Sequence, residues 1–191
     1  MALSLPIDQA ANDLLNRHPL SLLIGMTLDQ QIPLEKAFSS PHVLAERLGH
    51  EPAARELAEF DAEALVEIFG RTPALHRFPK AMAARVQEVC TMLVDRYDGD
   101  AARLWDEATT GKELVRRIAE LPGFGKQKSQ IFAALLGKQF GVTPEGWREA
   151  CGAYGEEGSR RSVADITDPA SLTQVREYKQ SVKAAAKAAK S

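Results

Sequence analysis

Helical periodicity recurs along most of this 191-residue chain, and no alternating run of β-branched residues is long enough for a strand. Pro79 predicts the start of one helix, because proline suits the first helical position. The apolar positions that follow it share one helix face: Val86, Val89, Cys90, Leu93, Val94 and Tyr97. Further helix starts are expected at capping side chains: Asp61, Thr110 with Glu113, and Asp168. The sequence therefore predicts an all-α helical bundle.

Length and composition indicate how many domains the chain forms and which class of protein it belongs to. The chain is long enough to bury one core, so we expect one domain over residues 1–191. Its 45% hydrophobic and 26% charged residues are ordinary for a soluble protein. Residues 1–19 lack the pattern of a secretory leader, and the longest apolar run, Leu20 to Leu28, is too short to span a bilayer. We expect a cytoplasmic monomer with no membrane partner.

Charge and cysteine content narrow the choice of partner. The formal net charge is −2, but residues 111–140 contain six basic and only two acidic side chains. Such a local positive surface suits contact with phosphates. Cys90 and Cys151 are the only cysteines, so a four-cysteine zinc site or iron–sulfur cluster is excluded.

Residues 121–125 read Leu-Pro-Gly-Phe-Gly and predict a tight turn between two helices, the second of which starts at Lys126. Gly123 and Gly125 permit positive φ and the close approach of a foreign backbone. The free N–H groups that begin the second helix attract an anion, and Lys126 and Lys128 make phosphate the natural ligand. A helix cap followed by a turn without a ligand is the alternative interpretation.

A second motif lies near the N-terminus. Residues 20–31 predict a central helix covered on most sides, because the segment is apolar almost all round until its end. That end carries Asp29, Gln30 and Gln31, and Pro33 prevents plain continuation of the helix. A polar helix end that faces solvent is the alternative explanation.

The two motifs, in this order, resemble the helix-hairpin-helix superfamily of base-excision DNA glycosylases, relatives of endonuclease III and of the bacterial adenine glycosylase. The resemblance extends from about Leu20 to Val142. It implies a helical fold, with two lobes around a DNA-binding cleft as one form, and a nucleoid-associated protein that binds duplex DNA with a damaged or modified base. It also implies that a glutamine, Gln30 or preferably Gln31, fills the gap left by a flipped base. The implied DNA contacts include all of residues 123–128.

Chemistry on a flipped base requires a carboxylate that stabilises the positive sugar and orients a water. The resemblance implies an aspartate a little over one helix beyond the turn, but by spacing this chain has Glu145 there. Glu145 would equally suit the first turn of a helix, where an acid complements the dipole. Asp165 and Asp29 are the alternative acids.

The position of the lysine decides between two chemistries. Bifunctional relatives carry a lysine two residues after the second glycine of the turn, where this chain has Gln127. Lys126 and Lys128 lie about 100° to either side on the helix, so neither replaces that lysine directly. We expect a monofunctional glycosylase that hydrolyses the N-glycosidic bond. Lyase activity through Lys128 and an inert, structure- or lesion-sensing DNA-binding protein remain the alternatives.

Two further sites are expected. Trp147 and Asp29 are the candidates to line a base pocket. The resemblance also fits an alkali cation, Na⁺ or K⁺, on the backbone carbonyls of Ala119, Leu121 and Phe124. No other cofactor is expected.

The C-terminal part is less regular. Residues 152–167 are rich in glycine, glutamate and arginine and predict a surface loop. Residues 169–190 predict a helix with an Ala/Lys tract. Its lysines form a basic stripe that indicates either a solvated helix end or a weak nucleic-acid contact: Lys179, Lys183, Lys187 and Lys190.

Overall fold

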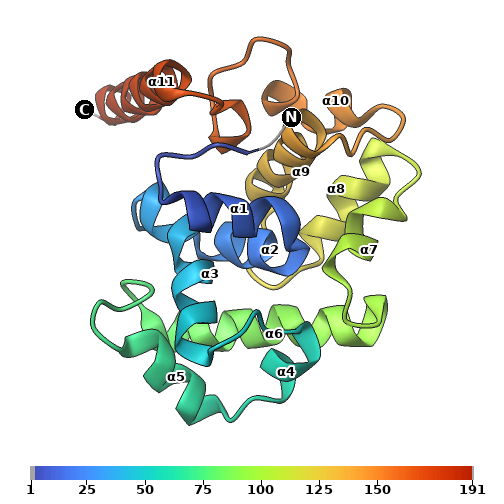
Figure 1. Cartoon of the computed structure of the whole chain (residues 1–191). Coiled ribbons are helices and arrows are strands. Elements are labelled where there is room, and N and C mark those ends of the chain that lie inside the picture. The colour runs from blue at the N-terminus through green and yellow to red at the C-terminus, as the bar shows by residue number, and fades with distance from the viewer. Residues whose placement is uncertain (1–2, 191) are drawn as a thin grey trace.

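The computed structural model describes residues 3–190, and over that range the chain is all-α, with no strand (Figure 1). The helices are α1 (Gln9–Arg17), α2 (Pro19–Leu28), α3 (Leu34–Leu48), α4 (Ala54–Glu59), α5 (Ala62–Gly70), α6 (Pro79–Tyr97), α7 (Ala101–Asp106), α8 (Gly111–Ala119), α9 (Lys126–Phe140), α10 (Trp147–Ala150), the 3₁₀-helices η1 (Gly152–Tyr154) and η2 (Val163–Asp165), and α11 (Pro169–Ala188). The predicted all-α class is confirmed over these residues.

Helix α2 is the central element of the core. Every residue from Leu20 to Leu28 is buried, and the helix contacts α1, α3, α6 and α7. Gly25 permits a close contact with α3, since a Cβ there would lie 2.9 Å from the ring of Phe38. The predicted central helix is therefore confirmed, although it ends at Leu28, three residues before the predicted end. The backbone leaves the helix with Asp29, Gln30 and Gln31 in the connection to α3.

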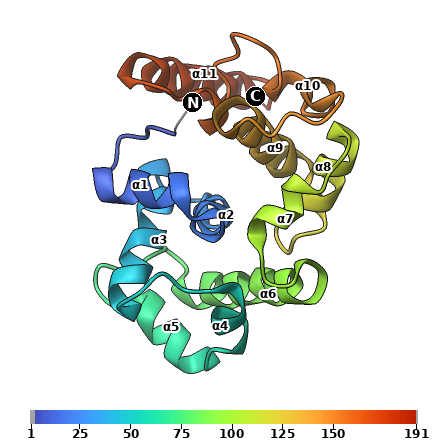
Figure 2. The ribbon, with the colours of Figure 1, turned by 45° about the vertical axis from the view of Figure 1, so that its right-hand side comes forward.

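Helix α6 runs along the side of the molecule opposite α11, in contact with α4 and α5 (Figures 1 and 2). It begins at Pro79, as predicted. Its buried residues include most of the predicted apolar face, namely Val86, Val89, Cys90, Leu93 and Tyr97. The face is buried because it packs on α4 and α5, while the other faces of α6 remain partly in solvent.

Helices α8 and α9 are joined by a connection of six residues, 120–125, and pack on each other. The start of α8 is capped by Thr110, whose hydroxyl accepts a hydrogen bond from the Glu113 N–H at 3.2 Å. The Glu113 carboxylate bonds back to the N–H of Thr109 at 3.0 Å rather than to that of Thr110. The predicted capping box is therefore only partly formed, because the Glu113 carboxylate accepts from the N–H of the residue before the cap.

Residues 152–167 do not form the plain surface loop that composition predicts. They contain η1 and η2, and the segment 162–166 is fully buried. The Asp165 carboxylate accepts hydrogen bonds from the N–H groups of Arg161 and Ser162, and it pairs with Lys138 of α9 at 2.6 Å. The segment therefore packs on α9 as part of the core.

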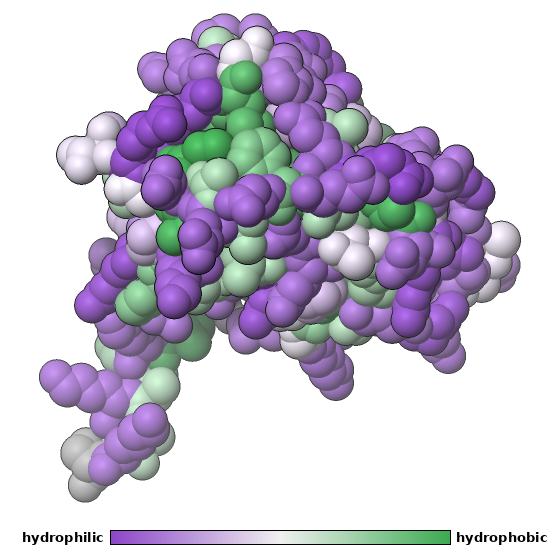
Figure 3. Space-filling model, turned by 90° about the horizontal axis from the view of Figure 1, so that it is seen from below, coloured by the Kyte–Doolittle hydropathy of each residue, from purple (hydrophilic) through white to green (hydrophobic). Residues whose placement is uncertain are grey.

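Helix α11 starts at Pro169, with Asp168 as its cap, as predicted. An ion pair between Arg176 and Glu35 ties it to α3. Residues 179–190 are exposed, and this end of α11 projects from the body of the protein (Figure 3). None of the helices between residues 3 and 190 combines the length and apolar character that crossing a bilayer requires.

Candidate functional site

The connection between α8 and α9 is anchored by apolar side chains. Leu121 and Phe124 are buried, and the Phe124 ring lies 6.2 Å from that of Phe132 on α9. The Phe124 N–H donates to the Leu121 carbonyl at 3.0 Å, which closes the turn. Gly123 has φ of 83°, a conformation that favours glycine. The predicted tight turn is present, and α9 starts at Lys126, as expected.

Helix α6 also approaches this turn. The guanidinium of Arg85 lies directly against Gly123, and a Cβ at residue 123 would overlap it. The positive φ favours glycine at residue 123, and a side chain there would also displace the flexible end of Arg85. Sequence reasoning missed Arg85, because only the fold shows that this residue of α6 faces the turn.

The side chain of Lys128 leaves α9 on the side that faces α2. Its Nζ donates to the carbonyl of Thr27 at 3.0 Å, in the last turn of α2, and lies 5.1 Å from the centre of the Phe124 ring. The connection brings together residues that are 101 positions apart in the sequence. The two sequence motifs thus meet in the structure, at the C-terminal end of α2 and the N-terminal end of α9.

The ionisation of Lys128 is shifted by this environment. The pKa of the Lys128 amine is lowered to about 8: burial is the largest cause, Asp29 opposes it, and the positive Arg85 adds to it. Burial likewise raises the pKa of Asp29, while Lys179 and Lys128 oppose that rise. The two groups therefore form an acid and an amine with pKa values shifted towards each other, a pattern typical of functional sites. The influence of Lys179 also shows that the basic stripe on α11 begins near this site.

Gln30 and Gln31 have different environments. The amide of Gln30 is half-buried and donates to the Thr27 carbonyl at 3.2 Å and to the Met82 sulfur at 3.4 Å. Gln31 is exposed and has a positive φ of 57°, which is uncommon for a residue with a side chain. Of the two, Gln31 is the one whose side chain is available to a partner.

His76 holds the backbone of Gln30 in place. Its Nε2 lies 2.9 Å from the Gln30 carbonyl, and its Nδ1 accepts a hydrogen bond from the Phe78 N–H at 3.0 Å. Because a carbonyl only accepts and an N–H only donates, Nε2 carries the proton and the ring is neutral. Burial, the largest influence, lowers the pKa of His76 accordingly. His76 is buried, and its ring positions the backbone of Gln30.

Glu145 is not part of this arrangement. It is exposed, and its carbonyl accepts a hydrogen bond at 2.7 Å from the N–H of Gly111, the first residue of α8. The turn is at the other end of α8, and a helix of nine residues is about 13 Å long. The structure therefore separates Glu145 from Lys128 and Asp29.

The remaining predicted residues are placed as follows. Trp147 packs its ring against Gly137 in the C-terminal half of α9, on the Glu145 side of the fold, and not beside Asp29. Asp165 is occupied by its pairing with Lys138. Gln127 is exposed and donates to the Tyr154 hydroxyl at 2.8 Å. Of the three candidate acids, only Asp29 lies near Lys128.

A groove of about 650 Å³ lies beside the turn, between residues of α8 and the first residues of α9. Its lining carries three basic side chains and no carboxylate: Lys112, Arg116 and Lys126, with Val115, Ala119, Phe124, Gly125, Gln130 and Ala150. Arg116 is also paired with Glu120 at 2.6 Å, which reduces its free charge. The groove gives the N-terminus of α9 a positive border, as the local charge of the sequence indicates.

Two features of the structure bear on metal binding. Within residues 3–190 no group of three or more His, Cys, Asp or Glu side chains is arranged to hold a metal ion. Of the three carbonyls expected to bind an alkali cation, that of Leu121 already accepts the Phe124 N–H. The cation site at Ala119, Leu121 and Phe124 stays a prediction.

No protein-family model matches this chain, and the searches of curated proteins and of solved structures found no significant match either.

Proposed function

We propose that this protein is a DNA glycosylase that binds duplex DNA at the α8–α9 turn and releases a damaged or modified base beside Lys128 and Asp29. One observation supports it above the others. Lys128 and Asp29 lie close enough to shift each other's pKa, although they are 99 positions apart in the sequence. The exposed Gln31 is two residues from that acid.

The binding step follows from the surface at the turn. The first N–H groups of α9 attract an anion, and the exposed Lys126 adds a full positive charge. The basic groove along α8 extends this surface to a second phosphate. A protein that neutralises a few phosphates binds DNA with an affinity that falls steeply as salt rises.

In this proposal the side chain of Gln31 fills the gap that the flipped base leaves in the duplex. Gln31 follows Gln30 in the chain, whose carbonyl accepts a hydrogen bond from His76 and whose side-chain amide donates to the Met82 sulfur. An exposed amide on a fixed turn can enter the stack and bond with the base opposite the gap. This supports base flipping, because the opened duplex needs such a replacement.

The chemical step uses Asp29 and Lys128. The base leaves with the electron pair of the N-glycosidic bond, and positive charge develops at C1′ of the sugar. Ionised Asp29 stabilises that charge and accepts a proton from the water whose oxygen adds to C1′. Protonated Lys128 favours the ionised form of Asp29.

A base-release assay tests the proposal. Duplex oligonucleotides carrying uracil, oxidised purines, alkylated purines, deaminated adenine or mismatches are incubated with the protein, then analysed with and without hot alkali. We expect strand cleavage after alkali only. Asp29→Asn should reduce release by about a hundredfold or more, which is typical of a lost catalytic acid or base. Glu145→Gln is the matched control and should retain activity; the opposite result for the two variants would overturn the assignment of Asp29.

An inert DNA-binding protein is the second candidate, and one observation favours it. The acid expected from the family pattern, Glu145, lies at the end of α8 away from the turn. This function predicts binding to lesion-containing duplex without base release from any substrate of the panel. Lys126→Glu combined with Lys128→Glu should weaken DNA binding under either function, and unchanged binding would exclude both.

A further inference from the structure

A second pocket, of about 410 Å³, lies at the other end of α9. We call it the α9–α10 pocket. Its walls are residues 137–139 of α9, Trp147 and Arg148 of α10, Thr143, and parts of the segment 157–167. Lys138 is ten residues from Lys128, about 15 Å along the helix. This pocket is therefore separate from the site at the turn.

Two buried polar atoms without a hydrogen-bond partner mark this pocket. They are Oε1 of Gln139 and Oγ of Ser159, and no other buried side-chain nitrogen or oxygen in residues 3–190 lacks one. Gln139 is 2% exposed and lines the pocket, with its Nε2 donating to the Ala164 carbonyl at 3.0 Å. Ser159, 8% exposed, lies between two lining residues, Gly158 and Arg160. Buried polar groups are normally paired, so the unpaired state points to a missing partner.

The charge and the aromatic surface of the pocket define that partner. Three basic side chains and two acidic ones line it: Lys138, Arg148, Arg160, Glu157 and Asp165. Lys138 and Asp165 neutralise each other at 2.6 Å, which leaves the two arginines against one glutamate. The guanidinium of Arg148 lies 4.5 Å from the centre of the Trp147 ring. One guanidinium beside an indole, with a second guanidinium in the same lining, suits a ligand that joins an anionic group to a planar ring.

We propose that the α9–α10 pocket binds a nucleotide. The base packs on the indole of Trp147, the phosphate pairs with Arg148 and Arg160, and an N–H or O–H of the base or sugar donates to Gln139. Its volume is within the range of small-molecule sites. Gln139 lines the pocket, and Ser159 adjoins it between the lining residues Gly158 and Arg160. A free mononucleotide and a nucleotide of a DNA strand share this chemistry.

Binding is tested on the full chain by calorimetry with four probes: dAMP, AMP, adenosine and inorganic phosphate. We expect saturable binding of the mononucleotides, and at least about tenfold weaker binding of adenosine and phosphate, because each lacks one of the two recognised groups. If phosphate binds as tightly as dAMP, the assignment of a nucleotide as the ligand is overturned, and the pocket is an anion site. Absence of saturable binding by every probe would overturn the proposal entirely.

Variants locate the ligand. Gln139→Met and Arg160→Gln should each raise the Kd for dAMP by about tenfold, while Lys126→Gln, at the other end of α9, should leave it unchanged. Arg160 is exposed, so its variant tests the pocket without a change in the core. Unchanged affinity in both pocket variants would overturn the site. In a Trp105→Phe background, Trp147 is the only tryptophan, and its fluorescence should change on binding.

The source of the nucleotide is decided by competition. A short single-stranded oligonucleotide that displaces dAMP supports a contact with DNA, and failure to displace it supports a free nucleotide. Lys126→Glu combined with Lys128→Glu weakens duplex binding at the turn under the proposed function, but should leave dAMP binding intact. Loss of dAMP binding in that double variant would place the nucleotide at the turn and overturn the separate pocket.

Discussion

The amine of Lys128 lies 3.0 Å from the carbonyl oxygen of Thr27, and this hydrogen bond ties the start of α9 to the end of α2. A carbonyl in the last turn of a helix lacks an intrahelical partner, and Lys128 satisfies this one together with the side-chain amide of Gln30. The bond leaves Lys128 in a partly buried position, where Arg85 and Asp29 act on its charge in opposite directions.

Replacing Lys128 by methionine should stabilise the fold near neutral pH. The pKa of Lys128 falls from its ordinary value of 10.5 to about 8 on folding, so the folded state binds fewer protons between these two values. Stability of the wild type therefore rises with pH across that window. At pH 7 both states are protonated, and Lys128→Met should gain at most about 3 kcal/mol. Urea unfolding at pH 7 and pH 10 measures the gain, which should shrink at pH 10.

The matched control for Lys128 is Lys126, which lies two residues earlier in α9 and is exposed. Lys126→Met should change the free energy of unfolding by less than about 0.5 kcal/mol at either pH. A gain that is equal for both variants, or independent of pH, would contradict the assigned environment of Lys128.

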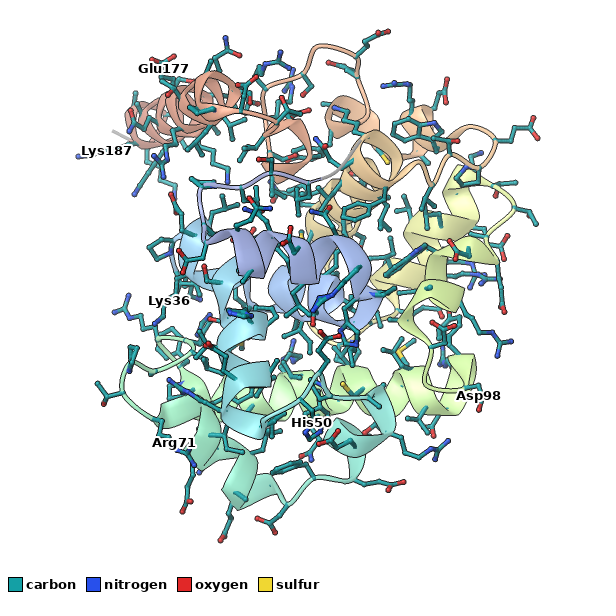
Figure 4. The ribbon with its side chains drawn as sticks, in the orientation of Figure 1. Lys36, His50, Arg71, Asp98, Glu177 and Lys187 are labelled. Atoms are coloured by element: carbon teal, nitrogen blue, oxygen red, sulfur yellow. The ribbon has the colours of Figure 1, made fainter. Side chains whose placement is uncertain are left out.

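Loss of Lys179 should raise the pKa of Asp29. Lys179 is the larger of the two positive influences that oppose the rise caused by burial. Lys179→Gln removes a charge that favours the carboxylate, so Asp29 should titrate at higher pH, and the difference from wild type should narrow as salt is added. NMR of the Asp29 carboxyl carbon measures this directly. Lys187→Gln is the control: Lys187 lies further along the projecting end of α11, as Figure 4 shows. An identical effect of both variants would indicate general screening instead of proximity.

Acid should weaken the fold through His76. Burial lowers the pKa of this imidazole below 6.5, so the unfolded state takes up a proton first as pH falls. The stability contributed by neutral His76 is present above pH 6.5 and is lost as pH decreases towards the folded-state pKa. His76→Gln should flatten this part of the pH profile. It should also cost about 1–3 kcal/mol at pH 7 if the Gln30 carbonyl or the Phe78 N–H is left unpaired. A variant as acid-sensitive as the wild type would show that another group is responsible.

A methyl group at residue 137 should disturb the packing of Trp147. The Cβ of Gly137→Ala would overlap the indole ring, which must then move. Overpacking of this kind costs about 1–3 kcal/mol, and the melting temperature should fall. Gly70→Ala is the control, because Gly70 has open space around it and no positive φ. Equal melting temperatures for the Gly137→Ala variant and the wild type would contradict the packing described.

Much of the fold could be predicted because it depends on local interactions. Pro79 and Asp168 mark helix starts through the geometry of the first turn, and the apolar face of α6 follows from the helical repeat. The turn at residues 121–125 was predicted because glycine is required there by backbone conformation. The segment 152–167 was predicted less well. Its composition indicates a loop, but ion pairing with Lys138 and packing on α9 bury part of it.

The helical class, the start of α9 at Lys126 and the apolar character of α2 can be predicted from the chain alone, since each depends on neighbouring residues. Which groups meet depends on how the helices pack. The tertiary structure placed Lys128 beside the end of α2 and Arg85 against Gly123, and it left Glu145 at the far end of α8. Spacing along the chain gives the position of a residue on its own helix, whereas the distance between two helices depends on how their side chains pack.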